Sequence, residues 1–264
     1  MLELINISKT FNPGTVNEKL ALDRLSLTIK DGEFVTVIGG NGAGKSTMLN
    51  AVAGVFFVDD GRIIIDGNDV TRLEEHRRAK YIGRVFQDPM MGTAASMGIE
   101  ENLALANRRG QFRGLKWGIT HKERQFYKEQ LATLGLGLEN RLTTKVGLLS
   151  GGQRQALTLL MASLKKPKLL LLDEHTAALD PKTAAKVLEA TEEIVRRNNL
   201  TTLMITHNMR DAINHGDRLI MLYEGRIAVD VSGEEKKKLT VEKLLEMFTT
   251  ASGSDEADDK LLLS

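Results

Sequence analysis

A glycine-rich run from Gly39 to Thr47 constrains the fold of this chain more than any other segment. It follows the apolar stretch Phe34 to Ile38, which is typical of a strand buried on both faces, and a helix is predicted after it, from Ser46 to Gly54. The run fits the pattern G-x-x-x-x-G-K-[ST] and consists of Gly39, Gly40, Asn41, Gly42, Ala43, Gly44, Lys45, Ser46 and Thr47. Glycines between a strand and a helix let backbone N–H groups surround a phosphate at the positive end of the helix. The run therefore predicts a phosphate loop and, with it, nucleotide binding.

Three side chains of this loop carry the predicted contacts. Lys45 is expected to neutralise β- and γ-phosphate oxygens, and Thr47 to support the α-phosphate. Ser46 offers a hydroxyl to Mg²⁺, an ion that prefers oxygen ligands and retains several waters. The motif by itself indicates a nucleotide without saying which one.

Two carboxylates follow a second apolar run, Leu169 to Leu172, at Asp173 and Glu174. A buried strand that ends in carboxylates delivers them to the sheet edge where phosphates bind. We expect Asp173 to hold Mg²⁺, directly or through water, and Glu174 to act as general base toward the attacking water. The alternative is a strand that simply ends in solvated acids.

The order of predicted elements indicates an α/β protein. Alternating apolar residues near both ends of segment 2–29 predict antiparallel strands, and segment 100–136 is mostly helical in pattern, with Phe126, Leu131 and Leu134 expected on one face. Gly110 and Gly114 are expected to mark a break in this helical segment. Strands and helices then alternate from about residue 152 to 206, which favours a parallel sheet, and a hairpin at 218–231 and a helix at 241–248 follow.

Composition limits the partners. The formal net charge is +1, so no strong field favours nucleic acid, and the absence of cysteine excludes disulfides and thiolate chemistry and fits a reducing compartment. The sequence lacks a secretory signal pattern and a run of about 20 apolar residues. If the protein acts at a membrane, we expect a partner to span it.

The segment Leu149, Ser150, Gly151, Gly152 and Gln153, together with Gln87, Asp180 and His207, carries a family resemblance. These residues resemble the signature sequence, Q-loop glutamine, D-loop aspartate and H-loop histidine of the ATP-binding subunit of an ABC transporter, in the family's order. The resemblance extends over about residues 1–248. It implies a P-loop NTPase of the ABC ATPase type, with a RecA-like parallel-sheet core, an N-terminal antiparallel β subdomain and a helical subdomain.

On this basis residues 1–248 are predicted to form a single ABC ATPase domain. Its parts are the β subdomain with the phosphate-loop part of the core at 1–86, the Q-loop and helical subdomain with the signature at 87–165, and the rest of the core at 166–248. Residues 249–264 are predicted to be a disordered tail, because segment 253–259 is acidic and rich in small residues.

The resemblance also implies roles for site residues. In the family two subunits pair head to tail, so that Ser150 and Gly152 of one copy, within the signature that includes Gly151 and Gln153, touch the γ-phosphate held by Lys45 of the other. Gln87 would sense Mg²⁺ and the attacking water, and His207 would contact the γ-phosphate and orient Glu174. Asp180 belongs to the same nucleotide-binding set. Phe11 fits the aromatic residue that stacks on adenine, although such a phenylalanine is also a common core residue.

Two residues depart from the family pattern. Gly40 stands where proline or serine is frequent, which should leave the loop intact because no N–H donor is lost. His175 stands where proline usually follows the catalytic glutamate. It is either a neutral substitution or an additional titrating group that changes the pH dependence of hydrolysis.

The family implies the remaining partners: ATP, Mg²⁺, a second copy or a homologous ATPase subunit, separate transmembrane permease subunits, and an extracytoplasmic solute-binding protein. It also implies that this chain lies at the cytoplasmic face of the cell membrane, bound through the permease subunits. Met90, Met91 and Met97 follow Gln87 and suit either a permease-docking surface or ordinary packing. The form of the chain favours an importer, with an amino acid or related small solute as the expected cargo, and nucleic acid is not expected as a partner. A competing hypothesis is a soluble ABC-type ATPase of a cofactor-assembly or other non-transport complex.

Overall fold

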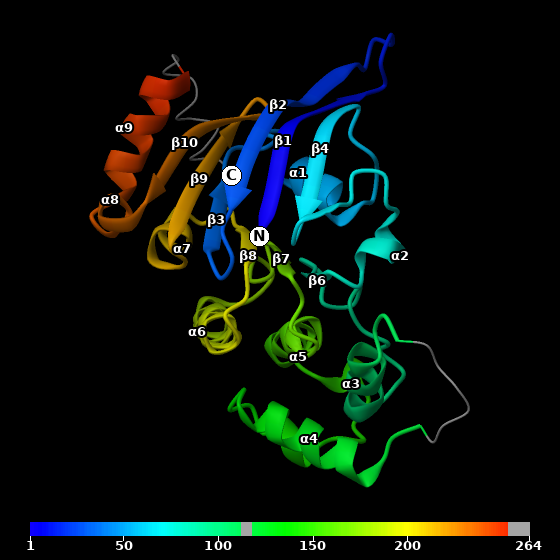
Figure 1. The fold of residues 1–264 in the computed structure, drawn as a ribbon. Coiled ribbons are helices and arrows are strands. Elements are labelled where there is room, and N and C mark those ends of the chain that lie inside the picture. The colour runs from blue at the N-terminus through cyan, green and yellow to red at the C-terminus, as the bar shows by residue number, and fades with distance from the viewer. Residues whose placement is uncertain (112–117, 253–264) are drawn as a thin grey trace.

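The computed structural model describes residues 1–111 and 118–252, which form two β-sheets with helices between and around them (Figure 1). In the described residues the first sheet has the strand order β2-β1-β4-β5 and is antiparallel throughout. Its strands are β1 (Leu2–Phe11), β2 (Lys19–Ile29), β4 (Asp60–Ile65) and β5 (Asn68–Asp69). The predicted antiparallel opening of the chain is confirmed.

The second sheet has the order β10-β9-β3-β8-β7-β6. Its strands are β3 (Phe34–Ile38), β6 (Ile82–Val85), β7 (Leu169–Asp173), β8 (Thr202–Ile205), β9 (Arg218–Tyr223) and β10 (Arg226–Ser232). Neighbours from β9 to β6 run parallel, and β10 pairs with β9 in the antiparallel direction. Because parallel strands share their direction, the loops that follow β3, β6, β7 and β8 leave the sheet at one edge.

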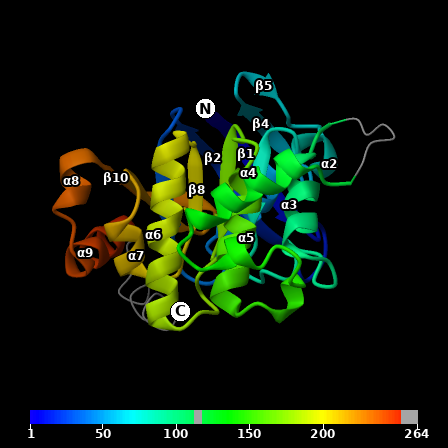
Figure 2. The same ribbon diagram turned by 90° about the horizontal axis from the view of Figure 1, so that it is seen from below.

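Helices pack against both sheets. α1 lies between the sheets, α5 and α6 run side by side across the other face of the parallel sheet, and α9 packs outside β10 (Figures 1 and 2). The described helices are α1 (Lys45–Ala53), α2 (Glu75–Arg78), α3 (Ile99–Asn107), α4 (His121–Ala132), α5 (Gly151–Ser163), α6 (Pro181–Asn198), α7 (Met209–Asn214), α8 (Gly233–Lys237) and α9 (Val241–Ser252), with short 3₁₀ helices at Leu138–Asn140 and Val146–Leu148. None of these helices is long and apolar enough to cross a membrane.

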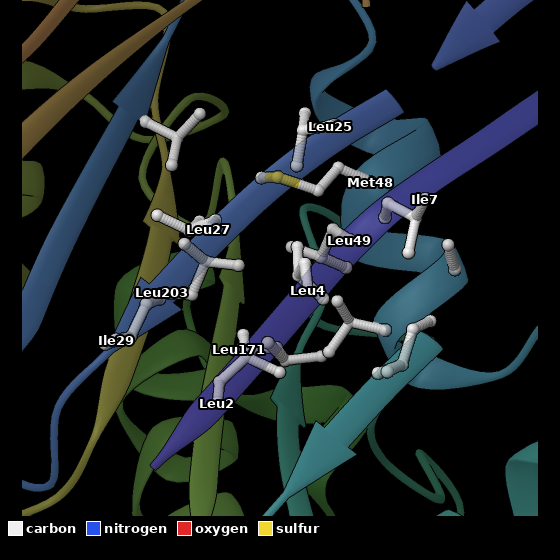
Figure 3. Packing of buried hydrophobic residues seen from close by; sticks show 14 of the residues in the cluster. Leu2, Leu4, Ile7, Leu25, Leu27, Ile29, Met48, Leu49, Leu171 and Leu203 are labelled. Atoms are coloured by element: carbon white, nitrogen blue, oxygen red, sulfur yellow. The ribbon is translucent and has the colours of Figure 1, made fainter. Parts of the chain in front are cut away.

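The main core joins the antiparallel sheet, α1 and one face of the parallel sheet (Figure 3). Leu171 of β7 points into this core with Leu49 of α1 and Leu4 of β1, whereas Leu170 and Leu172 point into a second core beneath α5 and α6. A strand buried on both faces needs apolar residues at every position. The uninterrupted run of leucines therefore fixes β7 in the centre of the molecule.

One detail of the helical prediction is wrong. Phe126 was expected on the same face as Leu131, but Phe126 is 37% exposed, whereas Tyr127 and Leu131 are both 0% exposed. Residues four apart share a helix face, so Leu131 pairs with Tyr127 and not with Phe126. The helix is anchored at its start by Thr120, whose hydroxyl accepts from the N–H of Glu123 while the Glu123 carboxylate accepts from the N–H of Thr120.

The last described helix, α9, continues to Ser252, so residues 249–252 of the predicted tail are helical. Residues 253–264, which carry the rest of that prediction, lie outside the described residues. Gly114, predicted to break the helical segment, also lies outside them, whereas Gly110 follows α3 with φ 73°.

Candidate functional site

The phosphate loop leaves β3 at Gly39 and enters α1 at Lys45. Gly39 has φ 149°, and a Cβ there would lie 2.4 Å from the carbonyl oxygen of Leu222 at the end of β9. Gly44 has φ 104° and a Cβ would lie 2.7 Å from the oxygen of Ala21. Only glycine fits these two positions, because the loop is packed against neighbouring backbone.

Gly44 is the N-cap of α1 and supplies no side-chain hydrogen bond, and the first turn of the helix contains no acidic residue. The first N–H groups of a helix lack intrahelical partners and carry partial positive charge. The N-terminus of α1 thus offers uncapped donors to an anion.

Lys45 is 7% exposed, and its Nζ donates to the carbonyl oxygens of Gly39 at 2.5 Å and Gly40 at 3.2 Å. Burial lowers the pKa of this amine, and the negative charge of Glu174 opposes that shift. The amine is therefore a desolvated donor held against its own loop, with Glu174 close enough to act on it electrostatically.

Asp173 and Glu174 follow the buried part of β7, where Asp173 lies beside Ile205 of β8. Glu174 adopts φ 43°, which is unusual for a residue with a side chain, and its N–H donates to the oxygen of Ile205 at 3.0 Å. Glu174 Oε2 lies 3.8 Å from Nδ1 of His207, which follows β8. The structure thus brings Lys45, Glu174 and His207 together from three parallel strands.

Arg84 was missed by the sequence reasoning. Its Nη2 donates to Oδ2 of Asp173 at 3.4 Å and to Oδ1 of Asn50 at 2.6 Å, so it connects β6, β7 and α1. Burial raises the pKa of Asp173, and the Arg84 charge opposes that rise. The available signal was a cation inside the short apolar strand 82–85, two residues ahead of Phe86 and close to Gln87. Gln87 itself is exposed at the same sheet edge.

The signature segment begins α5. Ser150 caps this helix, since its Oγ accepts from the N–H of Gln153 at 3.3 Å and its own N–H donates to Oε1 of Gln153 at 3.2 Å. Gly152 is buried, and a Cβ there would lie 2.1 Å from Cγ2 of Thr183 on α6. Among the described residues, no hydrogen bond or ion pair joins Ser150 to Lys45, Asp173 or Glu174. The structure therefore does not bring the signature to the phosphate loop of its own chain.

Asp180 ends the loop between β7 and α6 and caps α6 by accepting from the N–H of Thr183 at 3.1 Å. Hydrogen bonds from Thr183 lower the pKa of the Asp180 carboxyl.

Phe11, at the end of β1, packs edge-on against Phe56 with ring centroids 5.3 Å apart. Its stacking on adenine stays a prediction.

His175 is 2% exposed, and burial together with nearby His215 lowers its pKa to about 4. The imidazole is therefore neutral between pH 5.5 and 8, and it is not a titrating group of that range. Its Nε2 lies 3.1 Å from Oγ1 of Thr191 on α6.

A cavity of about 760 Å³ touches Gly40, Asn41, Gly42 and Ala43 and is also lined by residues of β9, β10 and α9. Lys45, Asp173 and Glu174 do not line it, so we do not assign it to the phosphates.

The oxygen atoms that could bind a metal ion at this sheet edge suit Mg²⁺. The Asp173 carboxylate, the Ser46 hydroxyl and the Gln87 amide oxygen are hard oxygen ligands, and Mg²⁺ commonly takes one or two carboxylates plus waters and phosphate oxygens. No group of three or more His, Cys, Asp or Glu residues that could hold a metal ion occurs in the described part of the chain. A site that relies on substrate phosphates and water is consistent with that finding.

A family model described as ABC transporter matches residues 22–177. The chain is 48% identical over 256 residues to the tyrosine transport ATP-binding protein of Clostridioides difficile, covering 95% of this chain and 100% of that protein. It is 34% identical over 235 residues to the spermidine/putrescine import ATP-binding protein PotA of Haemophilus influenzae, covering 89% of this chain but 59% of that relative.

Solved structures agree with these relatives. A dimeric ATP-binding cassette in a post-hydrolysis state, bound to ADP and Pi, matches with a TM-score of 0.74 and 30% identity, over 88% of this chain and 98% of that one. The ADP conformation of an ATP-binding cassette of an ABC transporter matches with a TM-score of 0.77 and 29% identity, over 94% of this chain and 98% of that one.

Proposed function

This chain belongs to the ABC transporter family as an ATP-hydrolysing subunit, and we propose that its transporter imports an amino acid. The predicted family, the ABC ATPase fold, ATP binding and ATPase activity are confirmed by these similarities. The proposed cargo class rests on the relative of C. difficile, which is matched over its whole length and is named for tyrosine transport. The same match over a transport protein favours a transporter over the soluble assembly ATPase.

We propose that hydrolysis is carried out by Glu174 with His207 as its orienting partner. The observation that carries this assignment is the 3.8 Å separation between Oε2 of Glu174 and Nδ1 of His207, beside the buried amine of Lys45. A carboxylate next to the γ-phosphate accepts a proton as water attacks, and His207 restricts the directions in which that carboxylate points. Lys45 exchanges its loop carbonyl partners for phosphate oxygens, which stabilises the negative charge of the transferred group.

Mg²⁺ is proposed to be held by Asp173, Ser46 and Gln87, where it neutralises phosphate charge when bound. The Arg84 guanidinium donates to Asp173 and opposes the rise in the pKa of this carboxyl that burial causes. We also keep Phe11 as the adenine-stacking residue, because it lies at the end of β1 on the rim of the antiparallel sheet.

The complete site is proposed to need two copies of the chain. The N–H groups of Ser150 and Gln153 are used in the capping box, which leaves those of Gly151 and Gly152 at the start of α5 as the donors of a second anion site. Within the described residues Ser150 has no hydrogen bond or ion pair to the phosphate-loop side of its own chain, and a related cassette was solved as a dimer with ADP and Pi. The signature of one copy therefore closes the nucleotide of the other, with Asp180 at the same interface.

Permease subunits and an extracytoplasmic solute-binding protein are the proposed further partners, with this chain at the cytoplasmic face of the membrane. Met90 and Met91 support a docking surface after Gln87, because they are 41% and 70% exposed. Flexible apolar side chains that remain exposed suit contact with a partner helix.

The base assignment is tested with Glu174→Gln, which keeps the shape but removes the proton acceptor. We expect ATP hydrolysis to be lost while an ATP-bound dimer accumulates in size-exclusion chromatography. Glu193→Gln is the matched control, because Glu193 lies on α6 with its side chain 63% exposed. Hydrolysis by Glu174→Gln at the wild-type rate would contradict the assignment.

The cargo class is tested in proteoliposomes that contain this chain, its permease and its solute-binding protein. We expect tyrosine or a related amino acid to stimulate hydrolysis, and spermidine to have no effect. Stimulation by polyamines alone would refute an amino-acid importer.

A further inference from the structure

His175 lies in the short loop that connects β7 to α6, directly after Glu174. The loop begins at the proposed base and ends at Asp180, the N-cap of α6. The main chain holds Glu174 on both sides: its N–H donates to Ile205, and its carbonyl accepts from the N–H of Ala177 at 3.0 Å. A residue with φ 43° and a side chain needs such restraint, because that conformation is disfavoured.

The side chain of His175 adds a restraint that no backbone bond supplies. Its Nε2 lies 3.1 Å from Oγ1 of Thr191, which is 0% exposed in the middle of α6. The Thr191 hydroxyl also lies 2.7 Å from the carbonyl oxygen of Val187 and donates its hydrogen there.

These two bonds determine the tautomer of His175. A hydroxyl has one hydrogen, and Thr191 uses it on Val187, so its oxygen accepts from His175. Nε2 of the neutral imidazole therefore carries the hydrogen, and Nδ1 does not. The bond runs from the β7–α6 loop to α6 and so joins His175 to Thr191, sixteen residues further along the chain.

We propose that His175 is a positioning residue for Glu174, and that the hydrogen bond from its Nε2 to Thr191 fixes the β7–α6 loop. The proposal rests on the proposed role of Glu174 as general base. Histidine does not restrict φ through its own ring as proline does, so the buried side-chain bond to α6 is the restraint that His175 itself adds to the loop.

The test compares two substitutions of Thr191 in the full chain. Thr191→Val keeps the shape but removes the acceptor, and Thr191→Ser keeps the hydroxyl but loses a buried methyl group. We expect Thr191→Val to lower kcat about tenfold with the KM for ATP nearly unchanged, because a small displacement of a catalytic group slows the chemical step. Thr191→Ser should keep kcat within about twofold of wild type, since a role in packing alone would make serine the more damaging change.

Thr202→Val is the matched control. Thr202 is 0% exposed, its Oγ1 bonds only locally to the oxygen of Leu200 at 3.1 Å, and it begins β8 at the opposite end from His207. Its thermal unfolding and kcat show how much stability and activity are lost when a buried threonine hydroxyl is removed and the hydrogen bond between His175 and Thr191 is kept. Equal kcat values for Thr191→Val and Thr202→Val would overturn the proposal, and so would equal losses in Thr191→Val and Thr191→Ser.

The tautomer gives a readout that does not depend on activity. Long-range ¹H–¹⁵N NMR spectra of the histidine side chains should show one imidazole with hydrogen on Nε2 that disappears in His175→Pro. A hydrogen on Nδ1 of His175 would overturn the proposal. The Glu174→Gln variant separates the proposed role of Glu174 from the proposed role of the His175–Thr191 hydrogen bond. If Glu174→Gln retains hydrolysis, the assignment of Glu174 as general base fails. If Glu174→Gln is inactive and Thr191→Val is fully active, only the positioning role of His175 is rejected.

Discussion

Gly152 has two possible functions in this chain, and one pair of substitutions separates them. A Cβ at this position would lie 2.1 Å from Cγ2 of Thr183, whereas carbon atoms in favourable contact are about 3.5–4.0 Å apart. Gly152→Ala therefore forces α5 and α6 apart or moves Thr183 from its rotamer, and β-branched side chains in helices have little freedom to move.

The expected change in the free energy of unfolding of Gly152→Ala follows from two opposing effects. Overpacking a well-packed contact costs about 1–3 kcal/mol, and replacing glycine by alanine within a helix returns up to about 1 kcal/mol. We expect Gly152→Ala to lower the free energy of unfolding by about 1–2 kcal/mol, which for a chain of this size corresponds to a fall in Tm of roughly 2–8 °C. Gly151→Ala is the control for stability, because a Cβ there meets only Cδ2 of Leu179 at 3.4 Å.

The second substitution, Thr183→Ser, removes the clashing methyl. An alanine at 152 would then meet the Cβ of residue 183 at 3.6 Å and its Oγ at 4.0 Å, which are ordinary contacts. We expect the double variant to regain stability to within about 1 kcal/mol of wild type. Thermal or urea unfolding measures this recovery, and unfolding of Gly152→Ala at the wild-type temperature would refute the close helix contact.

Hydrolysis by the double variant then tests the proposed role of the signature. If Gly152 also lets the backbone approach the phosphate held by a second copy, the added methyl keeps hydrolysis low although the fold has recovered. Recovery of both stability and hydrolysis would show that Gly152 is needed only for packing of α5 against α6.

Three further predictions follow from individual side chains. Lys45→Met should weaken ATP binding by roughly 10–100-fold, because charge-assisted bonds to phosphate contribute about 1.5–3 kcal/mol, and an unchanged affinity in calorimetric titration would contradict this. His175 is neutral in the folded chain because burial lowers its pKa to about 4. Between pH 6.5 and 4 the unfolded chain binds a proton that the folded chain does not bind, so the free energy of unfolding should fall over this range by at most about 3 kcal/mol. His175→Pro should lack this loss and keep the wild-type pH–rate profile between pH 5.5 and 8. Arg84→Met should lower stability by about 2 kcal/mol, because it leaves the Asp173 carboxylate, whose side chain is 19% exposed, without its cation. Adding Asp173→Asn should recover part of that loss, and strictly additive losses in urea unfolding would argue against the pair.

The fold was predictable where the pattern of apolar residues admits one interpretation. The continuous runs at 34–38 and 169–172 become β3 and β7, buried on both faces, and the hairpin around Glu224 is present as predicted. The helical segment was less certain, since Phe126 and Tyr127 are both aromatic and the register depends on Leu131. The sheet order, with β3 between β8 and β9, is a long-range property that the local pattern does not contain.

The site was predictable where chemistry follows a strand in the sequence. Lys45, Glu174 and His207 come together because each lies just beyond the end of a parallel strand, a consequence of topology that the motifs already imply. Arg84 and Thr191 were not found, because their roles depend on which residues of other elements face them. A cation in a strand and a threonine in a helix have no distinctive local pattern.

The signature segment shows why a motif does not by itself separate folding from function. Ser150 and Gln153 form a capping box that would stabilise α5 in a protein without any nucleotide, and Gly152 is required by the approach of Thr183. Yet a capping box uses only part of the N–H donors at a helix start, and the remaining N–H groups lack intrahelical partners and can bind an anion. The same local interactions therefore order the start of α5 within a single copy of the chain. If the proposed dimer forms around ATP, this surface is already ordered by folding, and closure has to fix fewer degrees of freedom.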